Sequence, residues 1–495
     1  MARVSGVLMP ITSLPSPYGI GTIGKEARKF ADFLKAAGQS IWQILPVGPT
    51  SYGDSPYQSF STYAGNPYMI DLDTLIKDGL LTKRQINKFY WGENDEEIDY
   101  GAIYYSRFEV LKIAYEKFKE GDQKAFDSFK RKNAKWIKDY ALYMAVKLSF
   151  DNKAWPEWED ESIRTRDPKA INRYTRKLSK EIDFWKWVQF EFYKQWEDFR
   201  AYVNKKGIKI LGDMPIYVAM DSADTWANPD VFWLDEERKP VCVAGCPPDY
   251  FSETGQLWGN PLYDWDYLKS TGYEWWMNRI AAADKLFDIT RIDHFRAFDT
   301  YYAIPFGAEN AIGGEWKNGP GIDFFNVMRD TLGDIRIVAE DLGELFDSVK
   351  ELLKESGYPG MKVLEFAFGD DNENAFLPHN YTENCVVYTG THDNDTVNGW
   401  FAQAEGWEKE HCMQYLGIGP GDEVNWKFIE AAYRSAADYA IIQMQDILGL
   451  GSEARINVPS TLGGNWTWRI NKDAITKEIT ERLNYLTKTY SRLED

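Results

Sequence analysis

Three carboxylates each stand at the end of a short apolar run of the sequence. They are Asp293 in RIDHF, Glu340 in VAEDLG and Asp393 in YTGTHDND, and a fourth carboxylate, Asp213, lies inside the run ILGDMPIY. An isolated Asp in such a place is commonly a helix N-cap or a turn residue, so no single one identifies a site. Four carboxylates that follow successive strands of one barrel would instead project into the same mouth.

The neighbours of two of these carboxylates predict different protonation states. Arg291 and Asp293 stand two residues apart, so on a strand their side chains share a face, and the arginine is expected to lower the pKa of Asp293. Glu340 follows Val338 and Ala339, an apolar lead-in that is expected to raise its pKa. One charged and one protonated carboxyl suit glycoside cleavage with retention, which requires them to lie about 5 Å apart. A buried structural ion pair is the alternative for Arg291 and Asp293.

A metal-dependent reaction agrees less well with the sequence than glycoside cleavage by two carboxyls does. The chain has four histidines: His294, His379, His392 and His411. They form neither H-x-H nor H-E-x-x-H, so a zinc hydrolase is not expected. Cys242 and Cys246 lack a second thiol or His pair nearby and are expected to be buried thiols. We expect no metal and no cofactor, although magnesium held by carboxylates alone stays open. His392 is expected to donate a hydrogen bond to substrate hydroxyls.

Eight short apolar runs end in polar or glycine-rich residues, and they are the strands expected to position these side chains. The runs are Val4–Thr12, Ser40–Pro49, Ile208–Val218, Asp288–Phe298, Arg336–Gly343, Gly360–Phe368, Cys385–Asp393 and Ala454–Ser460. Helical patterns lie between several of them, for example Glu26–Ala37, Phe346–Ser356 and Lys427–Leu448. This alternation predicts an α/β fold, a (β/α)₈ TIM barrel with its site at the carboxyl ends of the strands. A doubly wound sheet is the alternative, but no G-x-G-x-x-G or Walker motif follows any run.

Two long segments interrupt the predicted barrel. We expect residues 1–495 to form one catalytic barrel domain with large, mostly helical insertions after strands 2 and 3, at about 50–205 and 219–287. Within the first, Phe184–Phe199 carries aromatic residues at helical spacing, which favours a buried helix face over a sugar-binding stripe. The second is rich in Pro, Gly and Trp, and loops of this size above a barrel mouth commonly build the substrate site.

The composition is that of a folded, acidic chain. It has 57 Lys and Arg against 76 Asp and Glu, a net charge of −19, which argues against binding to nucleic acid or to an anionic membrane surface. The 20 Trp, 30 Tyr and 27 Phe exceed what core filling usually needs. No apolar run approaches the roughly 18 residues that span a bilayer, and the N-terminus lacks a secretory pattern. We expect a cytoplasmic protein; the sequence predicts no oligomeric state.

Several strings of the sequence, in this order, resemble the motifs of one enzyme family. They are SPYQSFSTYAGNP, ILGDMPIYV, CPPDYFSETGQLWGNPLYDW, RIDHFR, VAEDLG, TGTHDND and NWTWR. The family is the 4-α-glucanotransferases, glycoside hydrolase family 77 of the α-amylase clan, and the similarity runs from the first strand to about Arg469. The resemblance implies a (β/α)₈ barrel with helical insertions and no C-terminal β-sandwich. It also implies α-1,4-glucans and maltooligosaccharides as substrates.

The resemblance assigns roles to individual residues. Asp293 would be the nucleophile, Glu340 the acid/base, and Asp393 the carboxylate that holds substrate hydroxyls and strains the reacting ring. Asp393 is preferred to Asp395 because the clan's pattern is a His followed directly by the catalytic Asp. The residues expected to contact substrate are Tyr57, Asp213, Asp249, Tyr250, Trp258, Arg291, His294, His392 and Asn465. Of these, Tyr250 and Trp258 are expected to be acceptor platforms, because aromatic rings suit the apolar C–H faces of sugars.

Three functions stay open at this point. The expected one is a 4-α-glucanotransferase, which passes a glucan segment to the 4-hydroxyl of another glucan. A retaining α-glucan hydrolase would use the same carboxylates with water as acceptor. A noncatalytic glucan-binding protein on an enzyme fold is the least expected, because three separate carboxylates would then have no chemical role.

Overall fold

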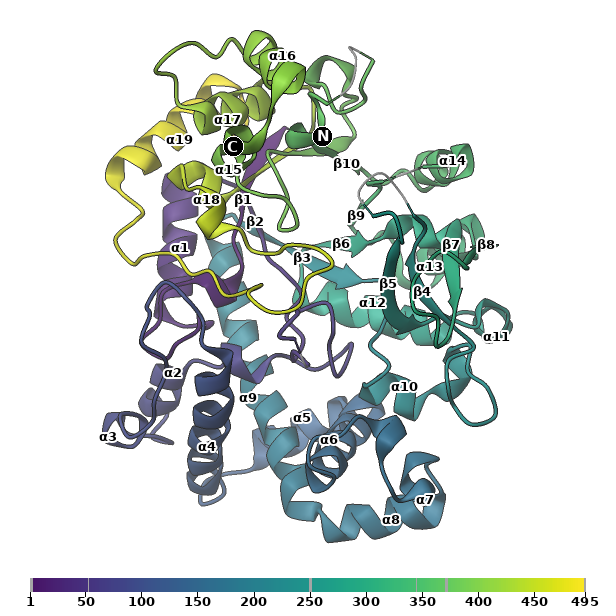
Figure 1. Cartoon of the computed structure of the whole chain (residues 1–495). Helices are drawn as coiled ribbons and strands as arrows, with labels where there is room; N and C mark the ends of the chain where they lie inside the picture. The colour runs from purple at the N-terminus through teal and green to yellow at the C-terminus, as the bar shows by residue number, and fades with distance from the viewer. Residues whose placement is uncertain (1–2, 52, 249–251, 344, 370–372, 494–495) are drawn as a thin grey trace.

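The computed structural model describes residues 3–51, 53–248, 252–343, 345–369 and 373–493, and its centre is an eight-stranded parallel barrel (Figure 1). In chain order the strands are β1 (Val4–Leu8), β2 (Ile41–Gln43), β3 (Lys209–Pro215), β6 (Ile289–Asp293), β9 (Ile337–Ala339), β10 (Gly360–Val363), β11 (Cys385–Tyr388) and β12 (Tyr439–Gln443). They pair in the order β10-β11-β12-β1-β2-β3-β6-β9. A hydrogen bond from Ala339 N to Pro359 O, of 2.9 Å, links the two ends of this order. The predicted (β/α)₈ barrel is confirmed.

Side chains inside the barrel change from apolar to polar along each strand. Leu211, Ile289 and Val338 belong to one buried apolar cluster that fills the barrel. Because side chains on one face recur every second residue, the next inward positions on β3 and β6 are Asp213 and Arg291. The carboxyl ends of the strands thus present polar groups that stand on a closed apolar layer.

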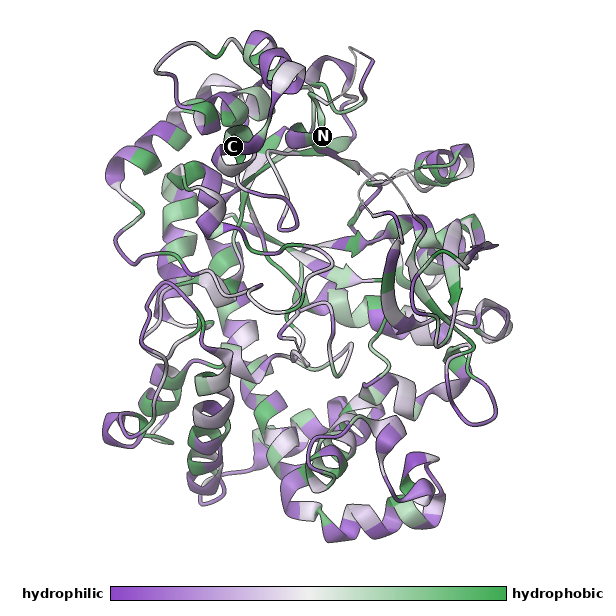
Figure 2. Cartoon of the chain, viewed as in Figure 1, coloured by the Kyte–Doolittle hydropathy of each residue, from purple (hydrophilic) through white to green (hydrophobic). Residues whose placement is uncertain are grey.

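Helices cover the outside of the barrel. Those that belong to the barrel repeat are α1 (Lys25–Ala36), α12 (Glu274–Leu286), α13 (Ile322–Leu332), α14 (Asp347–Ser356), α15 (Val397–Gln403), α16 (Gly406–Leu416), α17 (Val424–Arg434), α18 (Met444–Leu448) and α19 (Lys477–Thr489). Helix α12 packs on β3 and β6, and α17 packs on β12. In Figure 2 the outer helices carry bands of hydrophobic and hydrophilic residues, as expected for helices with one face on a core. Helix α19 is the last element of the described residues, which contain no C-terminal β-sandwich.

The eighth strand lies elsewhere than predicted. The prediction of Ala454–Ser460 is wrong, because the eighth strand is β12, which pairs with β1 and β11. It lies inside Lys427–Leu448, predicted as one helix and observed as α17, β12 and α18. A short, fully buried strand and a buried helix share the same continuous apolar pattern, so periodicity did not separate them. In the predicted run, Ile456 instead packs onto the apolar cluster inside the barrel.

The first insertion, between β2 and β3, is helical as predicted. Its helices are α2 (Leu72–Lys77), α3 (Lys83–Ile86), α4 (Tyr100–Phe118), α5 (Lys124–Lys132), α6 (Ala134–Ser149), α7 (Glu161–Arg164), α8 (Pro168–Lys177) and α9 (Ser179–Lys205). The aromatic stripe lies on α9, where Trp185, Phe192 and Trp196 are buried. The prediction of a core face is therefore confirmed. Helix α9 contacts α4, α5 and α6 as well as α1 and β3, so it links the insertion to the barrel.

The second insertion, between β3 and β6, contributes to a sheet that the sequence analysis did not predict. It contains α10 (Ala223–Ala227), β4 (Cys242–Cys246), β5 (Gln256–Pro261) and α11 (Trp265–Ser270), followed by α12. Strands β4 and β5 join β7 (Thr300–Pro305) and β8 (Glu315–Asn318) in an antiparallel sheet of order β5-β4-β7-β8. Cys242 and Cys246 at the ends of β4 are partly exposed, not buried as expected. No helix in the described ranges combines the length and apolar character needed to cross a membrane.

We predict that Trp196→Ala destabilises the protein without a direct effect on the active site. The indole is 1% exposed and its Nε1 donates to Leu286 O at 3.1 Å, so truncation leaves a cavity between α9 and the barrel. The expected loss in the free energy of unfolding is about 3–5 kcal/mol, measured by denaturant titration. The control is Glu197→Ala at the next, exposed position of α9, which should stay within about 0.5 kcal/mol of the original protein. Equal stability of the two variants would contradict the core assignment.

Candidate active site

A cavity of about 2120 Å³ opens at the carboxyl ends of the barrel strands. Small-molecule pockets usually measure about 300–1,000 Å³, so this one has room for a chain of several sugar units. Eight of the residues expected at the site line it: Tyr57, Trp258, Arg291, Asp293, His294, Glu340, His392 and Asp393. The fold thus brings the three candidate catalytic carboxylates to the wall of one cavity.

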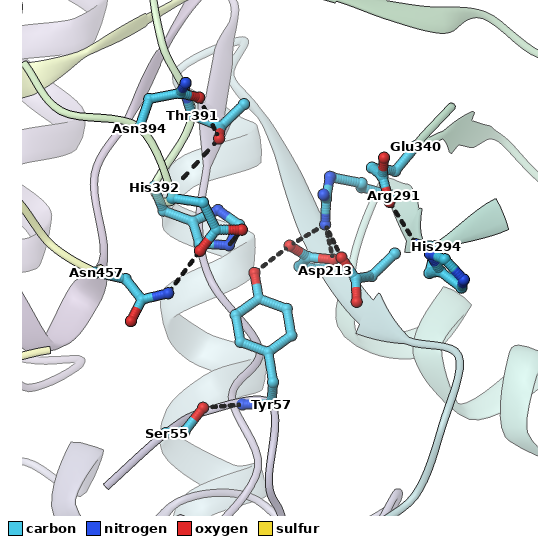
Figure 3. Close-up of polar contacts among 12 residues, drawn as sticks. Ser55, Tyr57, Asp213, Arg291, His294, Glu340, Thr391, His392, Asn394 and Asn457 are labelled. Carbon is cyan, nitrogen blue, oxygen red and sulfur yellow. Dashed lines mark hydrogen bonds and ion pairs between the residues drawn. The ribbon is translucent and has the colours of Figure 1, made fainter. Parts of the chain in front are cut away.

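One arginine connects two carboxylates beneath the cavity (Figure 3). Arg291 Nη1 donates to both carboxylate oxygens of Asp213, at 2.9 and 2.8 Å, and to Asp293 Oδ1 at 3.1 Å. The hydroxyl of Tyr57 donates to Asp213 Oδ2 at 2.7 Å. The Asp213 side chain is fully buried and is not among the residues that line the cavity, so its contact with substrate stays a prediction. Every second residue of β3 points into the barrel, so Asp213 lies one inward layer below the end of the strand. There its carboxylate holds Arg291 and Tyr57 in place.

Burial dominates the protonation of Asp293. It raises the pKa of Asp293 to about 6, while the charge of Arg291 acts in the opposite direction. The expected net lowering of this pKa is therefore not found. The physical reason is that burial outweighs the charge of Arg291, while the negative charges of Asp213 and Asp393 raise the pKa of Asp293 further.

Glu340 is held by two backbone donors. His294 N donates to Glu340 Oε2 and Leu342 N donates to Glu340 Oε1, both at 2.7 Å. His294 has a φ of 54°, an uncommon value for a residue with a side chain, and this turn directs its N–H at the carboxylate. Burial raises the pKa of Glu340 to about 7, against the lowering effect of Arg291 and the two N–H groups. The direction agrees with the prediction.

His294 itself has a neutral ring. Burial lowers its pKa to about 3, with a further contribution from the nearby Arg296. The ring meets Trp258 edge-on at a centroid distance of 4.9 Å. Trp258 comes from β5, so the second insertion supplies one wall of the cavity.

Asp393 is fixed from two sides. Asn457 Nδ2 donates to its Oδ1 at 2.6 Å, Arg455 Nη2 donates to its backbone oxygen at 2.6 Å, and His392 Nε2 lies 3.3 Å from its Oδ2. Burial acts to raise the pKa of Asp393, but His392 and the hydrogen bonds hold it well below the usual range. The His392 ring stacks on Tyr57 at 5.1 Å.

Asn457 and Arg455 were not expected at the site because they lie in the segment predicted as the eighth strand. Two polar residues two positions apart inside that apolar run, RIN, were the available signal.

Asp395 is occupied by contacts within the protein. It accepts hydrogen bonds from Thr396 N at 2.7 Å, Ser452 Oγ at 2.7 Å and Gln403 Nε2 at 3.0 Å. The Asp393 side chain, in contrast, is 44% exposed at the cavity. This difference supports the choice of Asp393 over Asp395.

Asp249 and Tyr250, two of the expected contact residues, lie outside the described residues. Asn465 does not line the cavity: its Oδ1 accepts from Val458 N at 3.0 Å and its Nδ2 donates to Thr461 O at 3.2 Å. These bonds stabilise the loop between α18 and α19, and a contact of Asn465 with substrate stays a prediction. Across the described ranges, no group of three or more His, Cys, Asp or Glu residues is arranged to hold a metal ion.

Comparison with known proteins agrees with this geometry. A family model described as 4-alpha-glucanotransferase matches residues 9–476. A 4-alpha-glucanotransferase of Clostridium butyricum is 49% identical over 98% of this chain and 100% of its own, and that of Thermus thermophilus is 44% identical over 100% of both. An amylomaltase of Streptococcus agalactiae, solved in complex with acarbose, superposes with a TM-score of 0.98 and 42% identity over 99% of this chain and 100% of its own. The chain therefore belongs to the 4-alpha-glucanotransferase family.

Proposed function

We propose that this enzyme transfers a segment of an α-1,4-glucan to the 4-hydroxyl of another glucan or of glucose, by a double displacement through a glycosyl ester on Asp293. One observation carries the assignment of roles: Asp293, Glu340 and Asp393 line one cavity, each held by a different set of donors. Both donor and acceptor would be α-1,4-glucans or maltooligosaccharides, and the chemistry calls for no cofactor.

In the first half-reaction, Asp293 attacks the anomeric carbon while Glu340 gives its proton to the departing glycosidic oxygen. The bond from carbon to oxygen breaks, an ester to Asp293 forms, and the released glucan carries a new hydroxyl. Near neutral pH the pKa values of about 6 and about 7 favour an ionised Asp293 and a partly protonated Glu340. Asp393, ionised throughout, would hold ring hydroxyls and support the distorted ring.

The second half-reaction reverses the proton transfer. The negative charge of Asp293 raises the pKa of Glu340, so its loss on ester formation lowers that pKa and makes Glu340 a better base. Glu340 then takes the proton of the incoming 4-hydroxyl, whose oxygen attacks the anomeric carbon and releases Asp293. Water at this point would give hydrolysis. The apolar face of Trp258 at the cavity wall supports a sugar as acceptor.

Two further parts of the proposal concern the whole chain. One buried hydrophobic cluster includes Val7 of the barrel, Trp196 of the first insertion and Phe232 of the second, which supports a single catalytic domain over residues 1–495 with its insertions at about 50–205 and 219–287. Four cysteines in 495 residues are too few for the disulfide framework of a secreted protein, so we propose a cytoplasmic location.

Incubation with maltotriose tests transfer against its alternatives. Transfer yields glucose and longer oligosaccharides, while the total of reducing ends stays constant because each bond broken is remade. The products are followed by chromatography and the reducing ends by a colorimetric assay. A steady rise in reducing ends would instead identify a hydrolase, and binding without any product would identify a glucan-binding protein.

We predict that Asp393→Asn and Asp395→Asn affect different properties. Asp393 faces the cavity, so its substitution should lower kcat roughly 100- to 1,000-fold. Asp395 is bonded to Thr396, Gln403 and Ser452, so its substitution should lower the melting temperature and change kcat by less than about tenfold. The reverse order of the two kcat values would show that Asp395 is the catalytic aspartate.

We predict a bell-shaped pH profile of kcat/KM with its maximum between about 6 and about 7. Activity should fall below this range because Asp293 becomes protonated and cannot attack. It should fall above the range because Glu340 loses the proton that the leaving oxygen needs. Initial rates at low maltotriose concentration across pH 4–10 measure the profile. A rate that keeps rising above pH 8 would contradict the role of Glu340 as the acid.

A further inference from the structure

A single tryptophan is exposed at the far end of the active-site cavity. Trp407, in the first turn of α16, lines the same cavity as the catalytic carboxylates. It is 56% exposed, and the chain's other tryptophans are all buried or partly buried, each within the described ranges. Figure 1 shows α16 at the outer edge of the molecule, whereas β6 lies at its centre. The ring is therefore part of the cavity, and the helix that carries it lies away from the strand that carries Asp293.

The start of α16 presents this ring with one face supported. Gly406, at the first position of the helix, has a φ of 55°, a left-handed value that favours glycine. His411, four residues after Trp407, stacks on the indole with a centroid distance of 6.2 Å and an angle of 20°. An indole backed on one face by another ring and exposed to this extent offers a flat apolar surface to the cavity.

The groups around Trp407 restrict the chemistry of what binds there. The neighbouring positions of the cavity wall supply the carboxylates of Glu405 and Glu408 and the amide of Gln403. Among the described lining residues the arginines are Arg291, which donates to the Asp293 carboxylate, and Arg455, which donates to the backbone oxygen of Asp393. Carboxylates accept hydrogen bonds from hydroxyls and repel anions, so this wall suits a neutral polyhydroxy ligand and disfavours a phosphorylated one.

We propose that Trp407 is a distal platform for the α-1,4-glucan chain, on which a glucose unit several residues from the reacting bond lays its apolar face. The flanking Glu405 and Glu408 accept hydrogen bonds from the hydroxyls of that unit. The cavity volume of about 2120 Å³ accommodates the intervening units. The inference rests on the proposed glucan substrate and adds to it a preference for long chains, which would extend from the carboxylates at the barrel strands toward α16.

The test compares two substrates in two variants of the full chain. Trp407→Ala should lower kcat/KM for short-chain amylose about three- to tenfold more than kcat/KM for maltotriose, mainly through KM. Trp407→Phe keeps a flat ring and should restore most of the preference. The matched control is Tyr105→Ala, which removes a ring that is 75% exposed on α4 and does not line the cavity. It should leave the ratio of the two kcat/KM values unchanged.

Equal losses of kcat/KM for both substrates in Trp407→Ala, or no loss for either, would leave the preference unchanged and would overturn the platform. A binding measurement keeps this result separate from the proposed function. Calorimetry with short-chain amylose on the Asp293→Asn protein, with and without Trp407→Ala, should show a three- to tenfold weaker Kd for the double variant. Equal Kd values would reject the platform, whereas failure of the unsubstituted protein to disproportionate maltotriose would reject the proposed function.

Discussion

The ion pair between the buried guanidinium of Arg291 and the carboxylate of Asp213 is the interaction on which the rest of the site depends. A buried charge without a partner destabilises a protein by several kcal/mol, and Arg291 has its partner one layer below the substrate, in the fully buried Asp213. Because the guanidinium of Arg291 donates to both Asp213 and Asp293, its positive charge stabilises the ionised form of Asp293 only in part. Its pKa is consequently raised to about 6 by burial, instead of being held at the low value that an exclusive ion pair would give. Asp293 remains ionised at neutral pH, yet it is a stronger base than an ordinary aspartate.

The same opposing effects of burial and charge determine the pKa of Glu340. Burial and the negative charge of Asp293 raise its pKa, whereas Arg291 and two backbone N–H groups lower it, and the result lies near 7. Because the pKa of Glu340 lies near neutral pH, the loss of one neighbouring charge changes its protonation strongly. In the proposed mechanism, esterification of Asp293 removes such a charge, so the acid of the first step would become the base of the second. Asp393 is kept apart from this exchange by His392 and Asn457, which hold its pKa low.

Local patterns predicted the parts of the molecule that depend on neighbouring residues. The spacing of Arg291 and Asp293 placed both on one face of a strand, and the helical spacing along α9 placed Trp196 in the core. What failed depends on contacts distant in the sequence. Strand β12 has the pattern of a buried helix, and only its pairing with β1 and β11 shows that it is a strand. The net direction of the Asp293 pKa was missed because it depends on how deeply the folded chain buries this carboxyl.

The central claim is that a sugar becomes covalently attached to Asp293, and mass spectrometry of the trapped protein tests it most directly. In a Glu340→Gln variant supplied with α-maltosyl fluoride, the fluoride leaves without an acid, but no base remains to activate an acceptor. The ester should therefore accumulate. The account predicts one maltosyl group per chain, on the proteolytic peptide that contains Asp293. A maltosyl group on the peptide that contains Asp393, or product formation with no attached sugar at any time, would contradict it.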